Sequence, residues 1–236
     1  ELGLYVVDEA NVEAHAYWAE LCQDPRWTAA FVDRGQRMVQ RDRNHPSIIV
    51  WSLGNDSGYG PNHGAMAGWI RHADPTRPIQ YEGGHAFDLR AEAPATDIVC
   101  PMYTPVEDLV AFARSSDATR PIILCEYSHA MGNSNGGLDA YVDAFERVPG
   151  LQGGFIWDWK DQGLLIEGAG EGEPRYACGG AFGDEPNDGT FCWNGLVAPD
   201  GAPHPALHEV AFLYQPLAMK AIDLAAGRFR LENRRA

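Results

Sequence analysis

The chain has 236 residues, of which 45% are apolar and 22% charged, an ordinary composition for a folded protein that excludes a disordered chain. Its formal net charge of −15 would repel a phosphate backbone, so nucleic acid is excluded as the main partner. No apolar run approaches the ~20 residues that span a membrane, so we expect no membrane segment. The five scattered cysteines include no CxxC pair, and we expect small buried thiols in a reducing compartment.

Six apolar segments predict buried strands, at residues 4–8, 48–53, 79–82, 98–103, 122–126 and 154–159. Helical periodicity separates them, with apolar faces formed by Trp27, Phe31, Met38 and Val39 in a first helix and by Met66, Trp69, Ile70 and Ala73 in a second. Residues 106–114 and 138–147 predict two further helices. This alternation is typical of an α/β protein with a parallel sheet.

The chain changes character after residue 159. The glycine-rich residues 163–172 predict a flexible surface loop, and residues 179–194 an ordered irregular loop. Residues 216–224 and 228–231 predict a β-hairpin. Because a lone hairpin is marginally stable in water, we expect it to open a truncated β-domain.

Polar or acidic groups follow three of the predicted strands, at Asn55-Asp56, Tyr103 and Glu126. This arrangement favours a (β/α)8 barrel, whose active site lies at the C-terminal ends of the strands, although six strands are fewer than the eight that closure needs. A doubly wound sheet is the alternative, but no GxGxxG motif follows any strand.

The pair of acids, Asp56 and Glu126, is what glycoside hydrolysis requires. Their structural alternatives are a helix N-cap for Asp56 and a paired surface acid for Glu126. Aromatic residues near the strand ends would pack on sugar rings or, alternatively, fill the core: Trp51, Tyr103, Tyr127, Trp157, Trp159, Phe191 and Trp193.

A candidate cation site lies just after the first strand. Glu13 and His15 are two residues apart and would point the same way on an extended segment. With Asp56 they would offer two carboxylates and an imidazole to a hard divalent cation. The alternative is that they are solvent-exposed polar residues.

Several long motifs occur in series. They are GLYVVDEAN at 3–11, RDRNHPS at 41–47, WSLGN at 51–55, ILCEYSHAMGN at 123–133, GGFIWDW at 153–159, FCWNGL at 191–196 and PHPAL at 203–207. In collinear order over nearly the whole chain, they resemble the glycoside hydrolase family 2 β-galactosidases. The resemblance implies an incomplete (β/α)8 TIM barrel with the third to eighth strands at residues 1–203. Residues 204–236 would be a linker and the first hairpin of a truncated β-sandwich.

The resemblance also implies a retaining β-galactosidase that hydrolyses terminal β-D-galactosides such as lactose. Glu126 would be the nucleophile and residue 56 the acid/base. The substrate-binding residues would be Asn55, Tyr103, His129, Trp157 and Asn194.

The same resemblance implies two cations, a cytoplasmic location and a homo-oligomer. Mg²⁺ would be bound by Glu13, His15 and Asp56. Na⁺ would be bound by the Phe191 carbonyl and Asn194.

Two departures from the family pattern matter. Asp56 stands where the family has Glu, which shortens the side chain by one C–C bond, about 1.5 Å, and predicts a weakened acid/base. The first two barrel strands and all preceding domains are not in this sequence, so we expect a fragment or a chain that needs the missing N-terminal segment. A non-catalytic galactoside-binding remnant is therefore the alternative. A related β-glucuronidase is disfavoured because no basic cluster near the motifs would bind a uronate carboxylate.

Overall fold

The computed structural model describes residues 3–166 and 175–234. The chain divides into two compact units. The first comprises Glu1–Tyr127 and Asp143–Phe155, and the second comprises Ser128–Val142 and Ile156–Ala236. Within the described residues, every helix is too short or too polar to cross a membrane.

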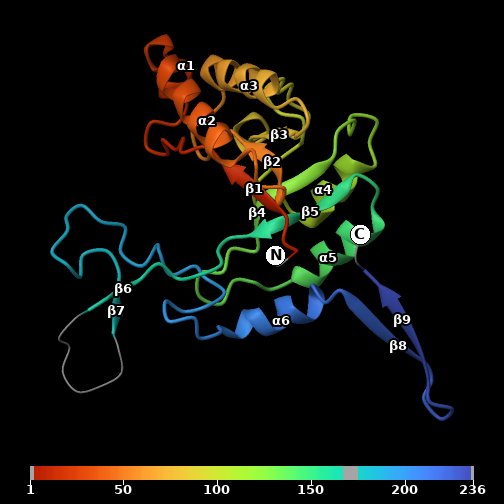
Figure 1. The fold of residues 1–236 in the computed structure, drawn as a ribbon. Coiled ribbons are helices and arrows are strands. Elements are labelled where there is room, and N and C mark those ends of the chain that lie inside the picture. The colour runs from red at the N-terminus through yellow and green to blue at the C-terminus, as the bar shows by residue number, and fades with distance from the viewer. Residues whose placement is uncertain (1–2, 167–174, 235–236) are drawn as a thin grey trace. The chain divides into compact units, whose positions relative to one another are not determined.

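Parallel strands form the frame of the first unit. β1 (Val6–Glu9), β2 (Ile48–Ser52) and β3 (Ile79–Gln80) make a parallel sheet in chain order (Figure 1). β4 (Ile122–Tyr127) pairs with β5 (Leu151–Ile156). The predicted α/β class with a parallel sheet is therefore confirmed.

The segment at residues 97–102 connects the two sheets. The Asp97 N–H donates to the Ile79 carbonyl of β3 at 2.7 Å, and Val99 makes a parallel bridge to Ile122 of β4. The strand predicted at 98–103 is nevertheless reduced to isolated bridges. Pro101 contributes to this reduction because proline has no N–H to donate to a ladder.

Four helices occur where periodicity predicts them: α2 (Thr28–Asp42), α3 (Pro61–Ala73), α4 (Val106–Ala113) and α5 (Leu138–Arg147). Three short elements were not predicted: α1 (Ala19–Gln23), η1 (Pro25–Trp27) and η2 (Glu82–Gly84). The assignment of Trp27 to the apolar face of the first helix is wrong. Trp27 ends η1, one residue before α2 begins, and it is 43% exposed.

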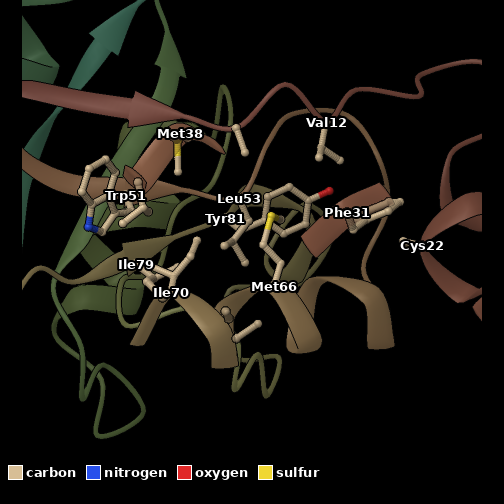
Figure 2. Packing of buried hydrophobic residues seen from close by; sticks show 14 of the residues in the cluster. Val12, Cys22, Phe31, Met38, Trp51, Leu53, Met66, Ile70, Ile79 and Tyr81 are labelled. Atoms are coloured by element: carbon tan, nitrogen blue, oxygen red, sulfur yellow. The ribbon is translucent and has the colours of Figure 1, made fainter. Parts of the chain in front are cut away.

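The main core lies between helices α2 and α3 and the sheet. Phe31 and Met38 from α2 and Met66 and Ile70 from α3 are buried in one cluster with strand residues (Figure 2). The strand side of this cluster includes Trp51, Leu53, Ile79 and Tyr81. The apolar faces predicted for these helices therefore do pack on the sheet.

A buried carboxylate, Asp74, fixes the end of α3 to this core. It accepts hydrogen bonds from Trp51 Nε1 at 3.0 Å and from Arg77 Nη1 at 2.5 Å. Burial alone would raise its pKa, but hydrogen bonds from Thr76 and Arg77 hold the pKa of Asp74 below its ordinary value.

β5 begins three residues earlier than predicted and ends before Trp157. Gly154, the predicted start of the strand, lies within it. A Cβ at Gly154 would lie 2.9 Å from the Tyr127 ring, so this glycine allows β5 to pass close to the end of β4.

The second unit contains short strands and a helix. β6 (Leu164–Leu165) pairs antiparallel with β7 (Tyr176–Ala177), so the predicted loop at 163–172 begins with a strand, and its residues 167–172 lie outside the described residues. No helix or strand lies within residues 179–194, as predicted. α6 (Pro205–Leu213), which was not predicted, precedes the predicted hairpin of β8 (Leu217–Asp223) and β9 (Arg228–Asn233). The boundary at residue 203 and the β-sandwich stay predictions.

Candidate active site

Polar and acidic side chains follow the C-terminal ends of the parallel segments in the first unit. They are Glu9 at the end of β1, Asn55 and Asp56 after β2, Glu82 after β3, Tyr103 after residues 97–102 and Glu126 within β4. Because neighbouring parallel strands end at one edge of the array, these groups gather at that edge. Sequence reasoning identified Asn55, Asp56, Tyr103 and Glu126 but gave no role to Glu9 or Glu82.

Glu126 and Tyr103 form the closest pair at this edge. The Tyr103 hydroxyl donates to Glu126 Oε2 at 2.5 Å, and the Tyr103 N–H donates to the Glu126 carbonyl at 2.9 Å. Glu126 is only 7% exposed, so its structural alternative as a surface acid is wrong. The two residues predicted to be nucleophile and sugar contact are thus in direct contact.

The surroundings of Glu126 raise the pKa of its carboxyl group to about 7. Burial is the main cause, and the hydrogen bond from Tyr103 acts in the opposite direction. The neighbouring carboxylates of Asp56, Glu9 and Glu13 raise the pKa further. In turn, burial and the contact with Glu126 raise the pKa of Tyr103, which keeps its phenol protonated.

Asp56 lies in a tight turn that follows β2. Its φ of 40° is in the left-handed region, and its N–H donates to Glu82 Oε1 at 2.6 Å. Gly54 lies so close to Val12 that a Cβ there would be 2.3 Å from the Val12 carbonyl oxygen. The N-cap alternative for Asp56 is wrong, because the N-cap of α3 is Gly60.

The candidate magnesium ligands are only partly brought together. His15 Nδ1 lies 3.4 Å from Asp56 Oδ2, and Glu13 makes a parallel bridge to Asn55. However, no three His, Cys, Asp or Glu side chains in the described part of the chain converge as a metal site requires. The arrangement does not fit a preformed magnesium site, so this ligand set stays a prediction.

Glu82 is the functional candidate that sequence reasoning missed. It is 2% exposed, and its Oε2 has no hydrogen-bond partner among the described residues. Burial raises the pKa of Glu82 to about 8, even though the Asp56 N–H lowers it. The sequence feature that could have identified Glu82 is its position, because it ends a predicted apolar strand just as Glu126 does.

The remaining predicted site residues belong to the second unit. The Ala130 N–H donates to the Trp157 carbonyl at 2.7 Å, which links the segment next to His129 to the residues after β5. The Asp158 N–H donates to the Asn194 carbonyl, also at 2.7 Å. His129, Trp157 and Asn194 therefore lie on segments that are hydrogen-bonded within one unit.

The sodium prediction has one structural observation in its favour. Asn194 is 2% exposed, and its Oδ1 has no hydrogen-bond partner among the described residues. A buried, unpaired amide oxygen fits a hard-cation ligand, because leaving it unsatisfied is costly. Phe191, whose carbonyl is the other predicted ligand, has a side chain that is 58% exposed.

A cavity of about 430 Å³ also lies in the second unit. Its lining includes Trp193, Asn133 and an ion pair in which His204 Nε2 lies 2.7 Å from Asp161 Oδ2. Asp161 also accepts the Gly195 N–H at 2.7 Å, so this pair fixes the loop that carries Asn194 and Trp193.

Comparison with known proteins gives a consistent result. The family described as "Glycosyl hydrolases family 2, TIM barrel domain" matches residues 1–219. A protein named beta-galactosidase from Aeromonas hydrophila subsp. hydrophila is 53% identical over 237 residues, which cover 94% of this chain and 22% of that protein. A beta-galactosidase from Enterobacter cloacae is 54% identical over 220 residues, which cover 88% of this chain and 21% of that protein. The chain thus spans about a fifth of the length of these relatives.

Solved structures show the same fold at low sequence identity. A GH2 beta-galacturonidase from Eisenbergiella tayi, bound to galacturonate, matches with a TM-score of 0.65 and 19% identity, covering 92% of this chain and 41% of that one. A beta-glucuronidase from an uncultured Clostridium sp. matches with a TM-score of 0.57 and 17% identity. The match covers 88% of this chain and 40% of that one. These matches support a partial TIM-barrel fold.

Proposed function

Because this chain belongs to glycoside hydrolase family 2, we propose that it carries the catalytic site of a retaining β-galactosidase. The observation that carries the proposal is the buried Glu126 carboxyl group, which accepts the Tyr103 hydroxyl at the C-terminal edge of a parallel array. The proposed substrate is a terminal β-D-galactoside such as lactose.

In the first step, a Glu126 oxygen forms a bond to the anomeric carbon while the bond from that carbon to the glycosidic oxygen breaks. The Asp56 carboxyl group gives its proton to the leaving oxygen. In the second step, the Asp56 carboxylate takes a proton from water, the water oxygen bonds to the anomeric carbon, and Glu126 is released as a carboxylate. The two steps together retain the anomeric configuration.

Tyr103 would orient the nucleophile. Its hydroxyl donates a hydrogen bond to Glu126 Oε2, which leaves the other carboxyl oxygen available to attack the anomeric carbon. The same hydrogen bond favours the ionised carboxylate, which is the nucleophilic form.

The charge around Glu126 favours a neutral sugar over a uronate. The carboxylates of Asp56, Glu9 and Glu13 are close enough to Glu126 to raise its pKa. A substrate carboxylate placed among them would be repelled. Asn55, His129, Trp157 and Asn194 are proposed as contacts to the galactose ring and its hydroxyl groups.

The two predicted cations differ in the structural support for their sites. The Phe191 carbonyl and Asn194 would hold Na⁺, which would supply an electrostatic contact to a sugar hydroxyl. Mg²⁺ at Glu13, His15 and Asp56 stays a prediction, and neither of the two proposed chemical steps depends on it.

The test is hydrolysis of 4-nitrophenyl β-galactoside by the longest natural chain that contains these residues. Glu126→Gln keeps the shape of the side chain but removes its nucleophilic charge, so we expect loss of at least ~1,000-fold in kcat. Asp56→Glu restores the longer arm, and we expect it to raise activity on lactose more than on the nitrophenyl substrate, whose leaving group needs less protonation.

The outcomes separate the two readings of the site. Activity that disappears in Glu126→Gln supports the proposed enzyme. Galactose binding without turnover, unchanged by Glu126→Gln or Asp56→Glu, would instead support the non-catalytic remnant.

A further inference from the structure

Glu82 is a buried acid that the mechanism above does not use. It begins η2, which follows β3. β3 pairs with β2, the strand that leads into Asp56. At 2% exposure its carboxyl group is enclosed by protein, so it is placed to act on other residues rather than on a substrate.

The contact that Glu82 makes is with the backbone of the acid/base turn. Its Oε1 accepts the Asp56 N–H at 2.6 Å. The φ of 40° at Asp56 is one that residues with a Cβ rarely adopt, so the turn needs support from its surroundings. A hydrogen bond to this N–H supplies that support at the strained residue itself.

Neighbours of Glu82 fix the other side of the same turn. The Tyr81 hydroxyl donates to the Gly58 carbonyl at 2.6 Å. A Cβ at Gly83 would lie 2.1 Å from the same carbonyl oxygen, so the two backbones are in close contact. Residues 81–83 therefore support residues 56–58. Among the hydrogen bonds of the described residues, the Asp56 N–H donates only to Glu82.

We propose that Glu82 is a positioning residue, which accepts the Asp56 N–H and thereby holds the residue-56 carboxyl group where it can protonate the glycosidic oxygen. This inference rests on the function proposed above. Asp56 has a shorter arm than the family's Glu, so its reach depends directly on where its backbone is held. A displacement of about 1 Å at a catalytic group can lower the rate about 100-fold.

The matched pair of variants is Glu82→Met and Glu82→Gln, made in the longest natural chain that contains these residues. Met has similar length but offers the Asp56 N–H only a weak sulfur acceptor, whereas Gln keeps an acceptor oxygen. Asp74→Asn is the structural control, since it weakens a buried hydrogen-bond network that involves Trp51 and Arg77 but none of the proposed catalytic groups.

The first readout compares phenyl β-galactoside, a poor leaving group, with 2,4-dinitrophenyl β-galactoside, a good one. For Glu82→Met we expect kcat/KM to fall roughly 10–100-fold on the phenyl substrate and much less on the dinitrophenyl substrate. Azide should speed turnover of the dinitrophenyl substrate, because it attacks the glycosyl intermediate without a general base. Glu82→Gln should keep the substrate ratio of the unaltered chain.

The second readout is hydrogen exchange of the peptide that contains residues 54–58, which needs no turnover. Glu82→Met should exchange faster there than Glu82→Gln. An unchanged substrate ratio in Glu82→Met, with a lowered Tm as in Asp74→Asn, would overturn the positioning role, and so would equal protection of this peptide in both variants. An inactive unaltered chain would count against the proposed function, while the exchange result would still decide whether Glu82 holds the turn.

Discussion

Of the four non-glycine residues with a left-handed φ in the described part of the chain, three lie next to the ends of parallel segments and one, Trp18, precedes α1. Asp56 and Tyr103 have φ values of 40° and 51°, and Ser128, directly after β4, has 51°. A left-handed conformation at a residue with a Cβ costs about 1–2 kcal/mol. Asp56 is the proposed acid/base, Tyr103 is hydrogen-bonded to the proposed nucleophile, and Ser128 is the first residue after β4. Within the first unit, the left-handed residues Asp56 and Tyr103 both follow parallel segments whose ends carry the proposed chemistry.

The hydrogen bond from Tyr103 to Glu126 contributes to the pH dependence that we expect for the proposed reaction. The nucleophile must be ionised, so kcat/KM should rise with pH through about 7, the pKa to which Glu126 is raised. Tyr103→Phe removes the hydrogen bond that lowers this pKa. A hydrogen bond to a charged group contributes about 1.5–3 kcal/mol, so the acidic limb should move up by about one pH unit or more.

The measurement is the pH profile of kcat/KM for 4-nitrophenyl β-galactoside. Tyr103→Phe should lose more activity at pH 6 than at pH 8. Tyr17→Phe, at an exposed tyrosine, is the control and should keep the original profile. An acidic limb at the same pH in both variants would show that Tyr103 does not stabilise the ionised form of Glu126.

At the scale of elements, periodicity predicts helices well because one helical face is buried. Met66 and Ile70 are fully buried in α3, as their spacing predicts. The apolar composition of residues 98–103 predicts a full strand. Pro101 interrupts the hydrogen bonds to the neighbouring strand because it has no N–H. The missed η2 has another cause: Gly83 and Gly84 follow Glu82 and allow a tight turn before the strand has run its predicted length.

The sequence likewise predicts only part of the candidate site. Glu126 lies in a long motif, Asp56 directly follows another, and Tyr103 ends a predicted strand, so residue type and position predict these proposed site residues. Glu82 acts through a backbone N–H contributed by a residue 26 positions earlier, and no sequence pattern encodes such a contact. Residues that hold others in place are found from geometry, whereas residues that react are found from type and position.

The contact between α2 and α3 yields a prediction about stability. A Cβ at Gly35 of α2 would lie 2.6 Å from Met66 Cγ and 2.8 Å from Met66 Sδ, and Met66 is fully buried. Overpacking costs about 1–3 kcal/mol, which should exceed the ~1 kcal/mol that alanine adds in helix propensity. Gly35→Ala should therefore lower the free energy of unfolding.

Gly68 in α3 is the matched control, because a Cβ there would meet nothing within 4 Å. Gly68→Ala should raise stability by about 0.5–1 kcal/mol through helix propensity alone. Urea unfolding of both variants measures the difference. Equal stabilisation by the two alanines would mean that α2 and α3 do not pack as closely at Gly35 as the structure shows.

At the scale of the whole molecule, the parallel array has edges. Six extended segments follow one another in chain order, fewer than the eight that close a barrel. Among the described residues, β1 pairs only with β2. Tyr5 and Leu4, directly before β1, are 73% and 66% exposed. An apolar edge of this kind pairs readily with another chain.

We therefore expect the 236 residues alone to self-associate through the β1 edge and to turn over galactosides poorly. The longest natural chain that contains them should be uniform in size and active, since segments outside these residues would pair with that edge. Size-exclusion chromatography with light scattering, alongside nitrophenol release, measures both properties.

Tyr5→Lys is the discriminating variant for this prediction. A charge beside an exposed strand edge discourages pairing, so it should reduce self-association of the 236-residue chain without restoring turnover. Phe212→Lys on α6, also exposed at 67%, adds the same charge in the second unit and should leave association unchanged. If both substitutions reduced association equally, self-association would not depend on the β1 edge in particular, and the edge would not be the site where another segment completes the barrel.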